Sequence, residues 1–313
     1  MKFNFESYRS FANIVKEYSF KNEEGIYTSD LKLPYDTSFG LDKNNFLYII
    51  LPLKNEISGF QLKDFLTLKD NVIFFSDNKE IKLEGSPLIF KEKKIRDQYS
   101  FLSQIDLLLD SENFVSKLNH FFELLQKARN SRTTFNAASF FAELCTIKKL
   151  LNIMPTIANQ WASSANSTID FLPSEFNPAI EVKSTTSQDQ RIHKFSINQI
   201  RYFQNDPSSL ISSVIVHEFE NGISCKDICK SLLLKLEPKN LGFDQINAAL
   251  IAYSELNDFN NCYFDEGTTL SSIKFYNPDF KELPLQTPPF WLKGGKLDID
   301  MSVLKESDNY NYE

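Results

Sequence analysis

The sequence predicts a mixed α/β protein, in which a β-rich N-terminal region precedes a region that contains both helices and strands. Residues 25–92 contain short apolar runs of strand length that prolines interrupt. From about residue 96 the apolar residues recur with helical spacing. Beyond residue 136, helical segments alternate with strand-like segments.

The N-terminal part is predicted to hold one helix and several strands. Helical spacing over residues 6–19 gives way to Phe46–Leu53, a continuous apolar run with the length of a buried strand. Val72–Phe75 and Glu80–Leu83 flank the turn-like Ser76-Asp77-Asn78 and predict two further strands. Prolines in this region argue against long helices.

The rest of the chain is predicted to alternate helices and strands. Apolar spacing predicts helices over 101–109, 114–125 and 136–152, strands over 168–172 and 178–185, a helix over 196–203, a strand over 211–219, and helices near 224–236 and 243–255. The tail from about residue 262 is predicted to hold strand-like pieces broken by prolines. Because the spacing changes near residue 96, we predict a β-rich domain over residues 1–105 and a second domain over residues 106–313.

Composition and charge restrict the classes of function. Hydrophobic residues make up 42% and charged residues 24%, which excludes a disordered chain. The net charge of −7 does not steer the whole protein to nucleic acid. However, Val115–Asn205 holds ten Lys and Arg against six Asp and Glu, whereas Asp206–Glu313 holds nine against seventeen. We therefore expect any nucleic-acid surface in the middle of the chain and a partner-docking surface in the acidic tail.

Other patterns exclude further classes. The four cysteines do not form the pattern of a secreted disulfide scaffold, and the spacing of Cys225, Cys229 and His217 does not suit zinc. Nine glycines without a phosphate-binding motif argue against a nucleotide-cradling loop. The first residues lack the apolar run of a signal peptide, and no apolar stretch has the length of a membrane span. We expect a soluble, cytoplasmic protein.

Polar residues on the strand predicted over residues 178–185 are the strongest chemical signal. Side chains alternate along a strand, so Ile180 and Val182 face a core while Glu181 and Lys183 share the other face. Asp170 precedes them by a turn of about ten residues, so a hairpin brings the three polar groups together. Two carboxylates and an ammonium at this position suit Mg²⁺.

In this interpretation the metal is held by Asp170, Glu181 and the Val182 carbonyl, with open positions for water and a substrate phosphate. Lys183 orients the attacking water and offsets charge in the transition state. The alternative is an ordinary surface ion pair between Glu181 and Lys183.

Glu143 is a third candidate ligand because it interrupts an apolar helix face. At 100° per residue it falls between Leu150 and Ile147, where a carboxylate is costly unless it is paired or bound to a cation. The alternative is a structural ion pair with Arg129 or Arg132.

A polar helix start follows the strand. Ser196 is the predicted N-cap, and Arg191, His193 and Lys194 precede it; basic groups beside a helix N-terminus favour phosphate binding. Gln199 is placed to reach the metal-bound water or Lys183. The alternatives are a structural imidazole for His193, an exposed helix residue for Gln199, and a solvated basic face that includes Arg201.

This order of residues resembles the PD-(D/E)xK nuclease superfamily, and more closely a bacterial family named "PD-(D/E)XK motif protein" that occurs among restriction and phage-defence genes. The resembling stretches are Phe141-Ala142-Glu143-Leu144, Trp161, Asp170-Phe171, Ile180–Thr185 and His193–Ile200. Two positions depart from the pattern: Ala142 stands where glycine is expected, and Ile169 replaces the proline of the superfamily name.

The resemblance implies a restriction-endonuclease-like core, which is a mixed β-sheet flanked by helices. It also implies a Mg²⁺-dependent endonuclease, with Mn²⁺ as a substitute, that hydrolyses DNA phosphodiesters. It implies metal binding by Glu143, Asp170 and Glu181, a catalytic role for Lys183, and phosphate contacts or orienting groups from the helix that starts at Ser196. By analogy it implies a defence role with a neighbouring ATPase or methyltransferase and, for double-strand cutting, a homodimer. A catalytically silent DNA-binding subunit of a larger complex is the alternative, and a β-rich interaction protein is a third.

Overall fold

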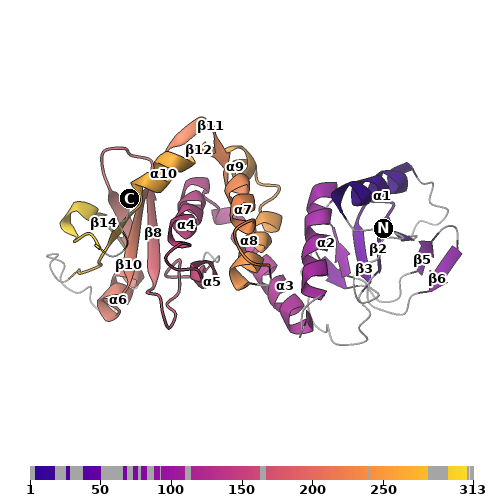
Figure 1. Cartoon of the computed structure of the whole chain (residues 1–313), viewed down its shortest axis with the longest axis horizontal. Coiled ribbons are helices and arrows are strands. Elements are labelled where there is room, and N and C mark those ends of the chain that lie inside the picture. Colours follow the sequence, from indigo (N-terminus) through magenta and orange to yellow (C-terminus); the bar gives the residue numbers. More distant parts are fainter. Residues whose placement is uncertain are drawn as a thin grey trace. The chain divides into compact units, whose positions relative to one another are not determined.

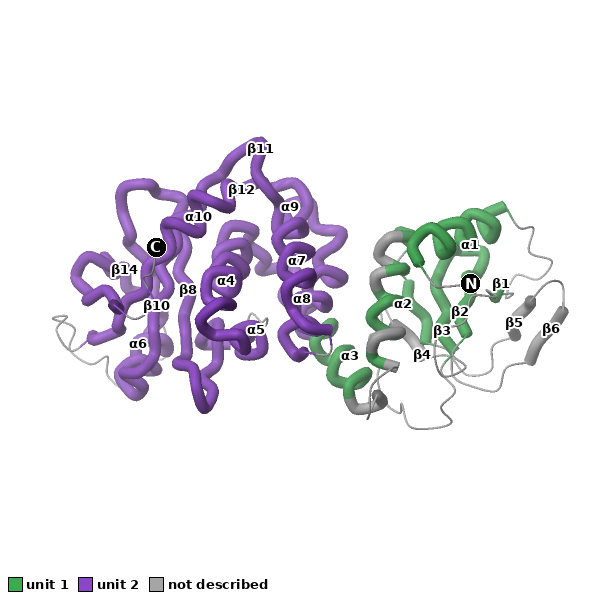
Figure 2. Tube along the Cα trace, in the orientation of Figure 1, with its two compact units in different colours: residues 1–126 green, residues 127–313 purple. Residues whose placement is uncertain are grey.

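The structure, a computed structural model, describes residues 4–17, 26–28, 38–50, 66–68, 73–76, 79–82, 88–91, 93–109, 114–162, 167–238, 240–280, 295–308 and 310. The chain divides into two compact units, Met1–Gln126 and Lys127–Glu313 (Figure 2). Residues 105 and 106, at which the sequence placed the domain boundary, lie within a helix, and that boundary stays a prediction.

The first unit is built on a seven-stranded sheet with the order β4-β7-β3-β2-β1-β5-β6. Its strands are β1 (Ile26–Thr28), β2 (Ser38–Asp42), β3 (Leu47–Ile50), β4 (Leu66–Leu68), β5 (Ile73–Ser76), β6 (Lys79–Lys82) and β7 (Leu88–Phe90). All neighbours pair antiparallel except β1 and β5, which are parallel. The predicted strands near residues 46, 72 and 80 are thus present, while residues 51–53 and the turn residues Asp77 and Asn78 lie outside the described part.

Helices accompany this sheet. α1 (Phe5–Glu17) buries Tyr8, Phe11, Ala12 and Val15, whose spacing puts them on one helix face. The Tyr8 hydroxyl donates a buried hydrogen bond of 2.9 Å to Gln98 of α2 (Ile95–Leu109). A third helix, α3, spans Phe114–Asn130. The helices predicted near residues 6, 101 and 114 therefore form.

The second unit contains the predicted mixed sheet. Its strand order is β13-β10-β8, where β8 (Ile180–Thr185) runs parallel to β10 (Leu210–Ile215) and β13 (Lys274–Tyr276) is antiparallel to β10 (Figure 1). α4 (Ala137–Leu150) packs on β8 and on α7 (Cys225–Leu233). α8 (Leu241–Ala252) packs on α7 and on the short α5 (Ile157–Gln160). The predicted α/β class, a mixed sheet flanked by helices, is confirmed.

The remaining elements surround this core. They are η1 (Arg132–Thr134), β9 (Ile192–Ser196), α6 (Ile197–Asn205), β11 (Glu218–Ser224), α9 (Asn257–Asn261), β12 (Tyr263–Phe264), α10 (Glu266–Ser272), β14 (Lys296–Asp300) and η2 (Met301–Val303). β9 pairs antiparallel with β14, and β11 pairs with β12. The prediction of one strand over 211–219 was wrong, since β10 and β11 are separate, and the tail predicted as strand pieces also contains the helix α10.

The strand predicted over residues 168–172 is reduced to an isolated bridge at Phe171. Phe171 and Ile180 exchange both backbone hydrogen bonds, at 2.9 and 3.0 Å, as in an antiparallel ladder. The next ladder donor, the Val182 N–H, bonds instead to the Asp170 side chain at 2.8 Å. The Ser167 hydroxyl donates to the Ile169 carbonyl, which would accept from the Val182 N–H if the ladder continued. A side chain thus replaces the backbone partner, so the strand stops.

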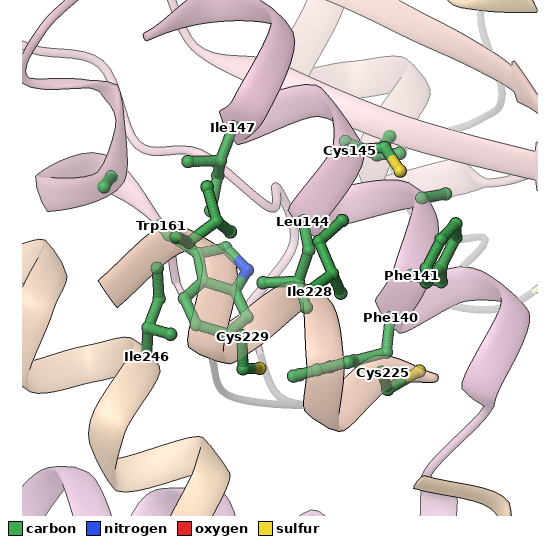
Figure 3. Packing of buried hydrophobic residues seen from close by; sticks show 14 of the residues in the cluster. Phe140, Phe141, Leu144, Cys145, Ile147, Trp161, Cys225, Ile228, Cys229 and Ile246 are labelled. Atoms are coloured by element: carbon green, nitrogen blue, oxygen red, sulfur yellow. The ribbon is translucent and has the colours of Figure 1, made fainter. Parts of the chain in front are cut away.

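The core of the second unit fixes the orientation of α4. Figure 3 shows Trp161 lying among Ile147 of α4, Cys229 of α7 and Ile246 of α8. These side chains are 0–1% exposed. Because α4 packs on β8 on one side and on α7 on another, its polar residue Glu143 is held beside the start of β8.

Candidate active site

β8 carries an acidic and a basic residue on one face. Its alternation puts Ile180 and Val182 into the hydrophobic core, as predicted. Glu181 and Lys183 face the other way, and the Lys183 Nζ lies 2.7 Å from the Glu181 Oε1. The side chains are only 4% and 16% exposed, so this is a buried pair rather than the surface ion pair that the sequence left open.

Asp170 joins Glu181 at the start of β8. Its Oδ2 accepts the 2.8 Å hydrogen bond from the Val182 N–H described above, which places the carboxyl group next to the strand. Burial raises the pKa of Asp170, although the Val182 N–H, Lys183 and hydrogen bonding to Glu181 each lower it. Burial and then the Asp170 charge raise the pKa of Glu181 to about 8, against a lowering by Lys183. Burial therefore opposes ionisation of both carboxyl groups, and the Asp170 charge opposes that of Glu181 in addition.

Glu143 lies close to this pair. Its Oε2 accepts a 2.7 Å hydrogen bond from the Trp161 indole N–H. Burial and then the Asp170 charge raise its pKa, the Trp161 bond lowers it, and Glu181 raises it further. Arg132, one of the two partners considered for an ion pair, lies 3.6 Å from Glu255 instead. The structure thus brings together the three acidic residues that the sequence singled out.

The hydrogen bonding of the three acidic residues indicates that they suit a divalent metal. The Glu181 Oε2 is buried without a hydrogen-bond partner, which is costly for an acceptor unless a ligand completes it. Burial raises the pKa of all three carboxyl groups, and the Asp170 charge further raises those of Glu143 and Glu181. Once ionised, they are the hard, anionic donors that Mg²⁺ prefers. The donor set fits such a cation. In the described part of the chain, however, no group of three or more His, Cys, Asp or Glu side chains is already spaced to hold a metal ion.

Gln199 connects the helix start to the acidic residues. Its Oε1 accepts hydrogen bonds from the Lys183 ammonium at 3.2 Å and from the Ser196 N–H at 3.0 Å. Its amide nitrogen donates to the Glu181 Oε1 and, at 3.2 Å, to the Thr168 carbonyl. Ser196 is the N-cap of α6, as predicted, and forms a capping box with Gln199. The amide therefore holds both the carboxylate and the ammonium, and it is not a simple exposed residue.

The basic residues before α6 differ in their surroundings. Arg191 donates to the Ser213 carbonyl at 2.8 Å and to the Ser272 carbonyl, and burial lowers its pKa. His193 is 3% exposed with its Nε2 2.7 Å from the Ser213 Oγ, and burial, with the Lys183 and Arg191 charges, lowers its pKa to about 4. His193 is therefore buried, whereas Arg191 is half-buried with its guanidinium held by two backbone carbonyls, and a phosphate contact of either residue stays a prediction. Lys194 is exposed.

Two neighbours of the site were not found from the sequence. Phe195 lies under Lys183, with the Nζ 5.1 Å from the ring centroid, and so supports the position of the ammonium. Trp161 was noted only as part of the resemblance, whereas its indole donates to Glu143. No sequence spacing links these residues to their partners, because each contact joins separate elements of the fold.

The comparisons with known proteins agree with this geometry. Residues 109–285, more than half of the chain, match the model of a family described as "Putative PD-(D/E)XK family member, (DUF4420)". The chain belongs to this family. The resemblance to PD-(D/E)XK nucleases found in the sequence is thereby confirmed. No curated protein and no solved structure is similar enough to the chain to count as a match. Among the described residues, no helix has the length and apolar character needed to cross a membrane.

Proposed function

We propose that this protein is a metal-dependent endonuclease that hydrolyses DNA phosphodiester bonds, with Mg²⁺ as the cofactor and Mn²⁺ as a substitute. The observation that carries the proposal is the meeting of Asp170, Glu181 and Lys183 at the start of β8, with Glu143 beside them, in a chain of a PD-(D/E)XK family. The unpartnered Glu181 Oε2 supports the metal requirement.

Each residue has a distinct role in this proposal. Glu143, Asp170 and Glu181 would hold the cation, which when bound supplies Lewis-acid activation of water and of the phosphate. Lys183 orients the attacking water through its ammonium and offsets the negative charge that develops on the phosphate oxygens. Gln199 keeps that ammonium in place by accepting one of its N–H groups.

DNA is the proposed partner because these residues belong to Val115–Asn205, the part of the sequence in which Lys and Arg outnumber Asp and Glu. Lys194 is exposed two residues before the Ser196 cap, so it is available to a phosphate group. Ser196 and the α6 N-terminus belong to the same proposed contact, to which we also assign the half-buried Arg191, whereas the buried His193 supports it from inside. We further propose a role in a bacterial restriction or phage-defence system, with a homodimer or a neighbouring ATPase or methyltransferase as partners.

Plasmid cleavage tests the proposal. Supercoiled DNA is incubated with the wild-type protein and with Asp170→Asn, in Mg²⁺, Mn²⁺, Ca²⁺ or EDTA, with and without the proposed partner proteins. Asp189→Asn, which changes an exposed aspartate, is the matched control. We expect nicked or linear DNA from wild type and control in Mg²⁺ or Mn²⁺ only, and none from Asp170→Asn.

The same assay separates the alternative. A wild-type protein that binds DNA but does not cut it with any metal or partner supports the silent DNA-binding subunit. Equal cutting by wild type and Asp170→Asn contradicts the assignment of the metal-binding residues.

A further inference from the structure

A cavity of about 240 Å³ adjoins two of the acidic residues. Its lining includes Glu143 and Asp170 together with residues from η1, from the first turns of α4 and from the end of α8. The proposed metal and phosphate site accounts for the acidic part of this lining. Most of the remaining lining residues are aromatic or uncharged and polar, and the hydrolysis of a phosphodiester does not by itself require them.

Aromatic rings form one wall of the cavity. Phe135 has its ring centroid 4.9 Å from Tyr253 and 5.4 Å from Phe140, and Phe140 lies 5.6 Å from Trp161. Phe140, Trp161 and Tyr253 are buried, at 7%, 1% and 3% exposure, whereas Phe135 is half-buried. Contacts with the buried rings of Phe140 and Tyr253 thus fix the position of the Phe135 ring. Because Phe135 is only half-buried, a ligand can contact this ring.

Polar groups accompany the rings. Asn136 and Ser139 are exposed residues of the lining, and the Asn136 Oδ1 is already used to cap α4 by accepting from the Ser139 N–H at 2.8 Å. The amide nitrogen of Asn136 has no hydrogen-bond partner in the described part of the chain. An aromatic surface with an available amide donor beside it matches the flat face and the acceptor-bearing edge of a nucleobase.

We propose that this cavity binds one unpaired nucleobase of the DNA strand that is cut. The inference rests on the proposed function and deepens it by naming the substrate class. Cavities that hold drug-sized ligands measure roughly 300–1,000 Å³, so a cavity of about 240 Å³ suits a single base better than a base pair. Since a base within a duplex is stacked and paired, it reaches such a cavity only after it leaves the helix.

A substrate preference follows from this geometry. A base that is already single-stranded enters the cavity without the free-energy cost of unpairing, while a base in a perfect duplex must first be extruded. Stacking on Phe135 stabilises the bound base. Single-stranded DNA, or a frayed or mismatched duplex, is therefore the preferred substrate class, by about tenfold or more in affinity over the fully paired duplex.

The test compares binding of one oligonucleotide as a single strand and as a duplex, measured in EDTA so that no cutting occurs. Ser139→Phe fills the mouth of the cavity, and Ser302→Phe is its control, because Ser302 is also an exposed serine whose N–H bonds to a capping side chain. Phe135→Leu removes the aromatic face but keeps apolar bulk, and Phe219→Leu, at a half-exposed phenylalanine, is its control.

We expect wild type and both controls to bind the single strand about tenfold or more tightly than the duplex. Both cavity variants should lose most of this preference for the single strand, while their melting temperatures stay near that of the wild type. If Ser139→Phe does not fold, the result for Phe135→Leu alone tests the proposal. A mononucleotide such as dAMP should compete only at far higher concentration if the occupant is a base on a strand, whereas strong competition would assign the cavity to free nucleotides and overturn the proposal.

Two outcomes distinguish a failure of the nucleobase site from a failure of the proposed nuclease function. A wild-type protein that binds both forms of DNA equally, with cavity variants that behave like their controls, overturns the nucleobase site and leaves the nuclease proposal standing. A wild-type protein that binds neither form, and cuts no DNA when Mg²⁺ is added, overturns the proposed function and the nucleobase site with it.

Discussion

Replacing Glu181 by Gln is expected to stabilise the metal-free protein at alkaline pH. Burial and the Asp170 charge raise the pKa of Glu181 from 4.5 to about 8 in the folded protein. Between these two values the folded protein keeps a proton that the unfolded chain releases. The stability of the wild type therefore falls as the pH rises from about 4.5 to about 8, and the neutral Gln side chain avoids this loss.

The pKa difference sets the size of the effect. The raised pKa of Glu181 lowers the free energy of unfolding by about 1.4 kcal/mol for each pH unit between the two pKa values. This loss amounts to roughly 1 kcal/mol or less at pH 5, about 3 kcal/mol at pH 7 and about 5 kcal/mol at pH 8.5. The pKa of about 8 already includes the attraction of the Lys183 ammonium, whose Nζ lies 2.7 Å from Glu181, so the loss of this ion pair is not subtracted again. We expect the substitution to stabilise the metal-free protein by about 3–5 kcal/mol at pH 8.5 and by about 1 kcal/mol or less at pH 5.

Urea unfolding at pH 5, 7 and 8.5 in EDTA measures this effect. Tryptophan fluorescence is a suitable signal, because Trp161 is 1% exposed in the unit that contains Glu181. Glu175→Gln is the control, since Glu175 is exposed on the loop between Asp170 and Glu181. Mg²⁺ should stabilise the wild type and the control by mass action but leave Glu181→Gln unchanged. A stability difference that does not vary with pH, or a variant less stable than wild type at pH 8.5, would refute the reasoning.

Three further predictions concern individual side chains. Lys183→Met should lower the cleavage rate by about 10² while DNA affinity stays within roughly 1 kcal/mol; an unchanged rate in an assay that EDTA stops would assign the chemistry to another residue. Lys194→Glu should weaken DNA binding and reduce its salt dependence more than Lys235→Glu does, because Lys235 is also exposed but lies in the acidic part of the chain; equal effects in filter binding would contradict a local basic surface. Trp161→Phe should weaken Mg²⁺-induced stabilisation, measured by calorimetry, because the Glu143 carboxylate loses its 2.7 Å donor; a full metal response would show that the indole does not position Glu143.

Part of the site was predictable because strand and helix periods are local properties of a sequence. Alternation along β8 places Glu181 and Lys183 on one face whatever the rest of the fold does. The helical period likewise places Glu143 on the apolar side of α4. For the same reason the N-cap Ser196 and the apolar segments of both units were identified from the sequence alone.

Other features depended on tertiary contacts. His193 and Arg191 both bond to Ser213 of β10, a strand whose position next to β8 no local pattern specifies, and the contact with phosphates expected of them stays a prediction. The strand expected at residues 168–172 fails because the Asp170 side chain takes the Val182 N–H.

The sequence by itself determined where most of the helices and strands lie, which face of β8 and of α4 carries the polar residues, and which family the chain resembles, because these properties depend on residue type and spacing within one segment. Only the tertiary structure decided that Gln199 bonds to both Glu181 and Lys183, that Trp161 donates to Glu143, and that Phe135 lines a cavity beside Asp170. The physical reason is that each of these contacts joins elements distant in sequence, and the free energy that sets them comes from the burial of the whole core.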